Sequence, residues 1–137
     1  MPTWNPTLAV GVNAIDAQHK ELFGRADALL EAMKQGRSGD EVLKLLAFLD
    51  DYCSRHFACE EKVMREQRYA GYDEHVAQHA IFVKQFQDLV AQFRARGQSP
   101  VLTIGLQKLI CGWLVQHIGA VDKKLAGALA GKEVRFV

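Results

Sequence analysis

Apolar residues recur along this chain at alternating spacings of three and four, which places them on one face of an α-helix. Four stretches carry this pattern, and short stretches rich in glycine and polar residues separate them. The predicted helices cover about 15–34, 40–65, 73–95 and 100–129. Ladders of β-branched residues in period two are absent, so we expect no sheet. The sequence therefore predicts an all-α fold.

Local signals indicate where these helices begin. Asn13 or Asp16 can cap the first helix, and Asp73 can cap the third. Ser99 can cap the fourth, because Pro100 follows it at the first helical position. Four such helices with short connections pack as an up-down-up-down antiparallel four-helix bundle.

The rest of the chain is expected to be accessory to this bundle. Residues 1–12 should form an irregular N-terminal arm anchored by Trp4, and residues 132–137 a short tail. A chain of 137 residues that is 49% hydrophobic is ordinary for one compact domain, so we expect residues 1–137 to be a single domain.

The net charge and the N-terminal sequence limit the classes of partner that are expected. The formal net charge is +1 and no basic block or acidic tail stands out, so neither nucleic acid nor an anionic membrane is expected as a partner. The N-terminus shows no secretion signal, and the apolar run at residues 109–115 is too short to span a bilayer, so we expect no membrane insertion. Cys53, Cys59 and Cys111 form no Cys-x-x-Cys pair, which favours small buried thiols in a reducing cytoplasm.

Several inward positions hold residues that do not suit an apolar core. Burying such groups without partners would cost roughly several kcal/mol each. In the predicted topology they all fall at one end of the bundle, together with Asp122. They are His19, His56, Glu60, His75, His79 and His117.

Spacing within the helices supports a shared site. His56 and Glu60, like His75 and His79, are four residues apart, which puts both side chains on one helix face. His117 and Asp122 are five apart, about 140° around an ideal helix. That pair requires Asp122 to reach sideways or the helix to be locally distorted.

One buried histidine is usually a hydrogen-bonded structural residue. Here all five histidines of the chain fall in one layer with two carboxylates, which favours a metal site. Seven donors exceed what one ion can use, so the pattern indicates two ions with bridging carboxylates. Structural zinc prefers four ligands and usually uses cysteine. Nitrogen and oxygen donors favour iron, with manganese as the alternative. Glu61 is five residues from His56 and is expected to be solvated or to support the ligands from outside.

At these residues the chain resembles the hemerythrin family, specifically its single-domain bacterial members. The resemblance covers nearly the whole sequence, including the arm, and fills all seven ligand positions. It rests on the motifs Ile15-Asp16-x-Gln18-His19, His56-Phe57-x-x-Glu60-Glu61-x-x-Met64, His75-x-x-x-His79 and Trp113-Leu114-x-x-His117-Ile118-x-x-x-Asp122.

The resemblance implies a division of the ligands between two non-haem iron ions joined by an oxo or hydroxo bridge. One iron would take His75, His79 and His117, and the other His19 and His56, with Glu60 and Asp122 bridging both. Dioxygen would bind at the open position of the two-histidine iron. An apolar pocket would exclude water there, lined by Phe57, Trp113, Leu114 and Ile118.

The function expected from this site is reversible dioxygen binding for storage, delivery or sensing, and not catalysis. Di-iron oxidases present about four carboxylates and two histidines, whose anionic oxygens stabilise highly oxidised iron. This site has two carboxylates and five imidazoles. The alternative is a di-iron redox enzyme, such as a peroxidase, an oxidase or a nitric-oxide-handling protein. Partners would be dioxygen, nitric oxide as a second small ligand, and an unidentified oxygen-accepting protein. Iron storage is poorly supported, because no acidic channel stands out.

Overall fold

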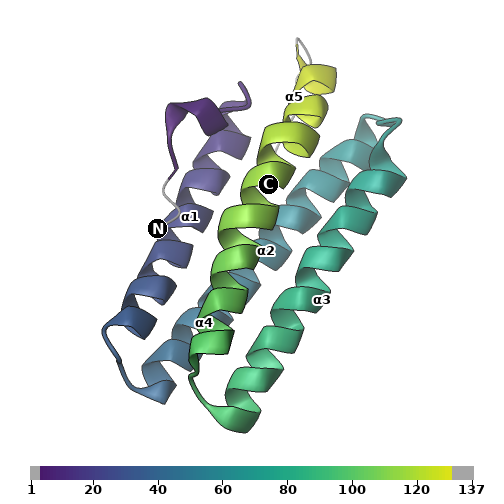
Figure 1. Ribbon diagram of the computed structural model, residues 1–137. Helices are drawn as coiled ribbons and strands as arrows, with labels where there is room; N and C mark the ends of the chain where they lie inside the picture. The colour runs from purple at the N-terminus through teal and green to yellow at the C-terminus, as the bar shows by residue number, and fades with distance from the viewer. Residues whose placement is uncertain (1–3, 131–137) are drawn as a thin grey trace.

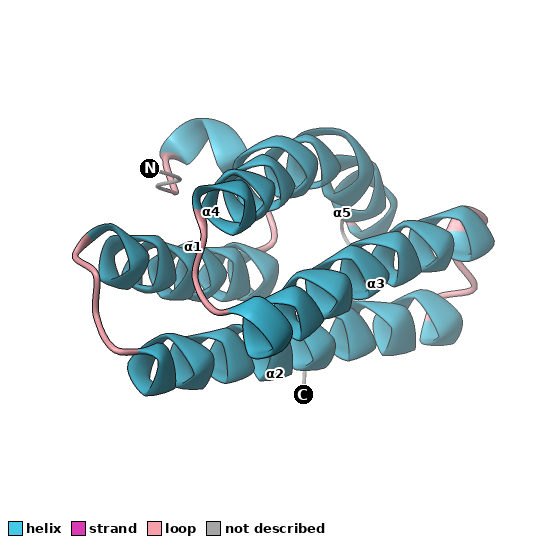
Figure 2. Ribbon diagram, turned by 60° about the horizontal axis from the view of Figure 1, so that its bottom comes forward, coloured by secondary structure: helices cyan, strands magenta, loops and turns pink. Residues whose placement is uncertain are grey.

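The computed structural model describes residues 4–130 and confirms the predicted four-helix bundle (Figure 1). Successive helices run antiparallel, and among residues 4–130 there is no strand (Figure 2). The first three helices are α1 (Asn13–Lys34), α2 (Gly39–Glu66) and α3 (Tyr72–Arg96). The fourth is one continuous rod made of α4 (Pro100–Gln107), η2 (Lys108–Leu114), η3 (His117–Asp122) and α5 (Lys123–Leu129).

The fourth helix departs from regular α geometry, because η2 and η3 are π-helical. A π-turn closes its hydrogen bonds over five residues instead of four, so it holds more residues per turn. A step of four residues then returns to nearly the same face. The buried face accordingly follows Leu106, Ile110, Leu114, Ile118, Asp122 and Ala126. The heptad-like spacing placed Trp113 and Val121 on the inward face instead, and both are only half-buried.

The predicted helix caps are partly wrong. Neither Asn13 nor Asp16 caps α1; the helix begins at Asn13 without a side-chain cap. Asp16 lies in its first turn and accepts a hydrogen bond from the backbone N–H of Val10 at 2.8 Å, which ties the arm to the helix. Gly71, not Asp73, occupies the position before α3. Ser99 caps α4 as predicted, since its Oγ accepts from the N–H of Leu102 at 3.1 Å.

The N-terminal arm is anchored on the bundle as expected. It contains one short 3₁₀ turn, η1 (Pro6–Leu8), whose Leu8 is buried. Trp4 packs against the main apolar cluster, and Lys20 Nζ lies 4.5 Å from the centre of its ring. The tail expected at residues 132–137 lies outside the described residues.

The apolar core is divided in two by a layer of polar side chains. The larger cluster occupies most of the bundle and includes Leu22, Phe57 and Phe82. The smaller cluster lies on the other side of the polar layer, before His19 on α1 and after the ligand residues on α2 and on the fourth helix. It consists of Ile15, Val63, Met64, Leu125 and Leu129. The polar layer is therefore enclosed by apolar side chains toward both ends of the bundle.

The fourth helix is also the most apolar. By length and composition alone, Pro100–Leu129 could cross a membrane, with a mean hydropathy of 1.3 over its most apolar 18 residues. In the bundle the helix packs against α1 and α3, and its buried face carries His117 and Asp122. In the bundle, 39% of that apolar stretch is buried.

The three cysteines differ in their exposure. Cys53 and Cys59 are buried as expected, whereas Cys111 is exposed, so the expectation of three buried thiols was wrong for Cys111. Burial also raises the pKa of the Cys53 thiol, because the thiolate is poorly solvated there. Cys111 and Cys53 should therefore differ in reactivity.

We expect Cys111 to be the fastest-reacting thiol of the native protein, because only an exposed thiolate can reach and attack the disulfide of a thiol reagent. Titration with Ellman's reagent should show a fast phase that disappears in Cys111→Ser and persists in Cys53→Ser. Loss of the fast phase in Cys53→Ser instead would contradict the exposure of Cys111.

Candidate metal centre

All seven residues predicted as metal ligands meet in the polar layer of the bundle. Each helix of the bundle contributes at least one of them, and none is more than 3% exposed. They are His19 from α1, His56 and Glu60 from α2, His75 and His79 from α3, and His117 and Asp122 from η3.

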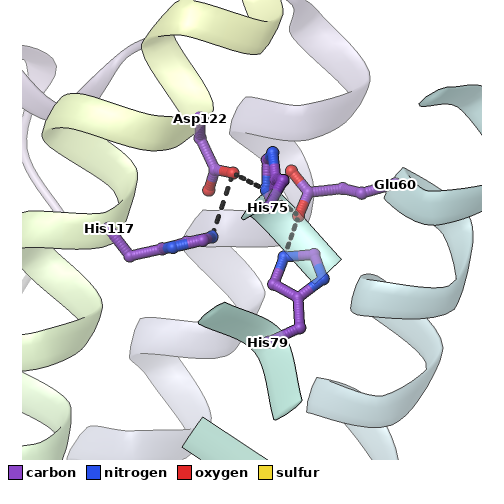
Figure 3. Close-up of side chains that lie close together, drawn as sticks. All are labelled: Glu60, His75, His79, His117 and Asp122. Atoms are coloured by element: carbon purple, nitrogen blue, oxygen red, sulfur yellow. Dashed lines mark ion pairs between the residues drawn. The ribbon is translucent and has the colours of Figure 1, made fainter. Parts of the chain in front are cut away.

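Their donor atoms form two overlapping groups. Within each group the donor atoms lie within 4.8 Å of one another. The first group, drawn in Figure 3, contains Glu60, His75, His79, His117 and Asp122. The second contains His19, His56, Glu60 and Asp122. Glu60 and Asp122 belong to both groups, as bridging ligands would.

The two oxygens of Asp122 face different histidines. Oδ1 lies 3.0 Å from His75 Nε2 and 3.3 Å from His117 Nε2, whereas Oδ2 lies 3.1 Å from His19 Nε2. Asp122 therefore spans both groups with one oxygen toward each.

Glu60 also faces histidines of both groups, through a single oxygen. Its Oε1 lies 3.2 Å from His79 Nε2, 3.5 Å from His56 Nε2 and 3.8 Å from His75 Nε2. Figure 3 shows Glu60 and Asp122 pointing toward each other from opposite sides of the site.

Within residues 4–130, most of these donor atoms have no hydrogen-bond partner. Both oxygens of Glu60 and of Asp122 are buried without one, as are the Nε2 atoms of four of the histidines, namely His19, His75, His79 and His117. Buried polar atoms in proteins are normally paired, and buried charges need a counter-charge. Converging lone pairs of nitrogen and oxygen are the environment that two bound cations would satisfy, so the residues present fit a two-metal site.

The surroundings favour the metal-binding form of two histidines. Burial lowers the pKa of His56 to about 3 and that of His79 to about 4, which keeps both imidazoles neutral. A neutral imidazole offers the lone pair that a metal ion requires.

The buried carboxylates need a compensating positive charge nearby. Burial raises the pKa of Glu60 to about 7, because its charged form is poorly solvated. Burial opposes the charge of Asp122 too, but the close approach of the His117, His19 and His75 imidazoles holds its pKa well below the usual range. Burial alone would lower the pKa of His75, yet Asp122 and Glu60 raise it to about 9. A bound cation would supply the same compensation as that proton.

The local helix distortion accounts for the five-residue gap between His117 and Asp122. Both lie within η3, whose hydrogen bonds close over five residues. This geometry brings the two side chains to the same side, with His117 Nε2 3.3 Å from Asp122 Oδ1. Of the two explanations that the sequence left open, the structure shows the distortion.

Three histidines donate a hydrogen bond from Nδ1–H to a side-chain oxygen that lies outside the layer of ligand residues. A donor at Nδ1 leaves the Nε2 lone pair pointing into the site. The pairs are His56 Nδ1 with Gln18 Oε1 at 2.6 Å, His79 Nδ1 with Glu61 Oε2 at 2.9 Å, and His117 Nδ1 with Gln78 Oε1 at 2.9 Å. Glu61 thus supports a ligand, one of its two expected roles. Sequence reasoning gave no role to Gln18 or Gln78, although each directly precedes a ligand histidine.

The four residues expected to line an apolar pocket are close in sequence to ligand residues. The ring of Phe57 stacks on His79 with centroids 4.0 Å apart, and that of Trp113 stacks on His117 at 4.6 Å. Leu114 and Ile118 are buried in the same apolar cluster as Phe57. Their role around dioxygen stays a prediction.

Comparisons with known proteins agree with this geometry. A family model described as the hemerythrin HHE cation binding domain matches residues 10–129. Bacteriohemerythrin of Methylococcus capsulatus is 34% identical over 88% of this chain and 91% of its own length. Myohemerythrin of Sipunculus nudus is 29% identical over 92% of each chain. A crystal structure of wild-type hemerythrin superposes with a TM-score of 0.84 at 30% identity, covering 96% of this chain and 99% of that one. A variant of hemerythrin with a leucine replaced by alanine gives the same TM-score.

The shared carboxylates make a prediction about metal content. Protein produced with ample iron should contain two metal ions per chain by elemental analysis. Glu60→Ala should lose most of both ions, because Glu60 belongs to both donor groups. His56→Ala should keep one, since the first group remains whole. Glu66→Ala, an exposed change on the same helix, is the control. One zinc ion per wild-type chain, or two ions in Glu60→Ala, would contradict the two-metal site.

Proposed function

This chain belongs to the hemerythrin family, and we propose on that premise that it binds dioxygen reversibly at a non-haem di-iron centre. The role would be oxygen storage, delivery or sensing. The observation that carries the proposal is the pair of donor groups that share Glu60 and Asp122, with their buried lone pairs lacking other partners.

We assign three histidines to one iron and two to the other. His75, His79 and His117 would hold the first ion, and His19 and His56 the second, with the two carboxylates bridging. The distances within the two groups support this assignment. The second ion has fewer protein donors, which leaves it more room for an added ligand. When bound, ferrous iron supplies the electrons for reversible dioxygen binding.

The donor set favours binding over oxidation chemistry. Di-iron oxygen-activating bundles present about four carboxylates and two histidines. Anionic oxygens stabilise highly oxidised iron, and here only two carboxylates face five imidazoles. A less strongly stabilised oxidised state supports release of dioxygen as well as its uptake.

The surroundings of the site support reversibility by keeping water out. Apolar clusters flank the polar layer toward both ends of the bundle. Phe57, Leu114 and Ile118 are each no more than 3% exposed, so this part of the wall is dry. Protons and water promote irreversible oxidation of an oxygen-binding metal site, and a dry wall opposes it.

Nitric oxide is small enough to be a second ligand of the same site, and a redox enzyme acting on peroxide, dioxygen or nitric oxide is the alternative function. We further propose a cytoplasmic role with a separate oxygen-accepting protein. The exposed thiol of Cys111 supports a reducing compartment, where such thiols remain reduced.

Absorption spectroscopy under controlled oxygen tests the proposal. Anaerobically reduced protein should gain an oxygenated absorption band in air, lose it under argon, and regain it over repeated cycles. His19→Ala should show no such band, because it removes a donor of the two-histidine group. Steady oxygen consumption with a reductant, and no stable band in the wild type, would favour the enzyme instead.

Leu114 should slow irreversible oxidation. It is 2% exposed and lies three residues before His117, so truncation would open space for water beside the site. We expect Leu114→Ala to bind iron normally but to lose its oxygenated band several-fold faster in air.

The matched control is Leu46→Ala, which removes the same buried group from α2. Leu46 lies ten residues before His56, about 15 Å along the helix at ~1.5 Å per residue. Equal decay rates in wild type, Leu114→Ala and Leu46→Ala would show that Leu114 does not guard the site.

A further inference from the structure

Three side chains accept a hydrogen bond from the Nδ1 atom of a ligand histidine. These outer partners follow an order around the bundle. Gln18 on α1 holds His56 on α2, Glu61 on α2 holds His79 on α3, and Gln78 on α3 holds His117 on η3. Each partner is the chain neighbour of a proposed ligand, namely His19, Glu60 or His79. Each of the first three helices therefore positions a ligand on the helix that follows it.

One of these partners differs from the others in charge. Gln18 and Gln78 accept the imidazole N–H with a neutral amide oxygen, whereas Glu61 accepts it with a carboxylate oxygen at 2.9 Å. The Glu61 side chain is 24% exposed, so it is only partly screened by solvent. The two proposed ions are thus unequal, because a carboxylate supports a histidine in only one of the two groups.

The contacts of His79 restrict its orientation as well. Phe57 stacks on the imidazole at 4.0 Å with planes only 12° apart, while Glu61 fixes the Nδ1 edge. The same two residues and His79 line a surface hollow of about 440 Å³ between α2 and α3, and of these three side chains Glu61 is the most exposed one. Rotation of the ring would break both the stacking and the hydrogen bond.

We infer that Glu61 is a positioning residue that makes His79 the strongest donor among the five histidines and lowers the reduction potential of the ion held by His75, His79 and His117. This rests on the proposed di-iron function. An imidazole that donates its N–H to a carboxylate gains electron density and becomes a more basic ligand. A more basic ligand stabilises ferric over ferrous iron. The amides of Gln18 and Gln78 have a weaker effect.

The variant Glu61→Gln separates charge from hydrogen bonding, because a glutamine oxygen can still accept from His79 Nδ1. Its control is Glu66→Gln, which removes the same charge from an exposed position on the same helix that pairs with Lys62. The reciprocal variant is Gln78→Glu, which gives His117 a carboxylate partner. None of these changes removes a proposed ligand.

The first measurement is metal affinity, by competition between the protein stripped of metal and a chromophoric chelator for Co²⁺ or Zn²⁺. Loss of an outer partner of a ligand typically weakens binding about 10- to 100-fold. The affinity of Glu61→Gln for one of the two ions should be weaker than that of the wild type by about tenfold. The affinity of Glu66→Gln should equal that of the wild type. Circular dichroism melting without metal should be alike in all, which shows that folding is not the cause.

The second measurement is the midpoint potential of the iron-loaded protein. If Glu61→Gln weakens ferric relative to ferrous binding about tenfold, its potential should rise by about 59 mV for a one-electron couple. Gln78→Glu should lower the potential. A purely structural role for Glu61 would not produce opposite shifts in two variants that both keep the hydrogen bond.

Equal shifts in Glu61→Gln and Glu66→Gln would overturn the inference, because long-range charge would then explain both. No shift in Gln78→Glu would also overturn it, because a carboxylate partner would not strengthen its histidine. A protein that never forms an oxygenated band, but shows the expected Co²⁺ affinity loss in Glu61→Gln, would refute the oxygen-binding proposal and leave the positioning role intact.

Discussion

Two carboxylates buried among five imidazoles are the constraint on which the rest of this structure depends. Without compensating charge, such a layer would cost roughly several kcal/mol for each ionised group. Cations bound by Glu60 and Asp122 remove that cost, so their binding energy becomes part of the folding free energy. The apolar clusters on both sides of the layer raise the cost of leaving it unfilled and also keep water away from whatever binds there. Stability and chemistry therefore depend on the same side chains.

Much of the site could be predicted because periodicity on α1, α2 and α3 is regular. The inward positions of His19 and Glu60 followed from the same spacing that places leucines in the core, and topology brought them to one end. The fourth helix was predicted less well, because it does not keep 3.6 residues per turn. Its heptad-like spacing placed Trp113 and Val121 inside, and both are only half-buried. A π-turn depends on backbone hydrogen bonding that the side-chain pattern does not encode.

The outer partners were missed for a different reason. Gln18 and Gln78 are unremarkable polar residues in the sequence, and their importance depends on how far each helix is rotated toward its neighbour. Two neighbouring helices must be packed before a hydrogen bond between them can be identified. Glu61 was noticed only because it competes with Glu60 for the ligand position. Residues that bind metal can thus be read from spacing within one helix, whereas residues that orient them require the relation between helices.

The order of the three outer hydrogen bonds also bears on the handedness of the bundle. Consecutive residues of an α-helix point about 100° apart, in a sense fixed by its right-handed screw. On α1 and α3, which run the same way, the partner precedes a ligand; on the antiparallel α2, Glu61 follows one. All three partners are therefore turned in one rotational sense around the bundle axis. In a bundle winding the opposite way, Gln18 would face the fourth helix and Glu61 would face α1. These three side chains would then leave their histidines without support, so the site itself distinguishes the native topology from its mirror arrangement.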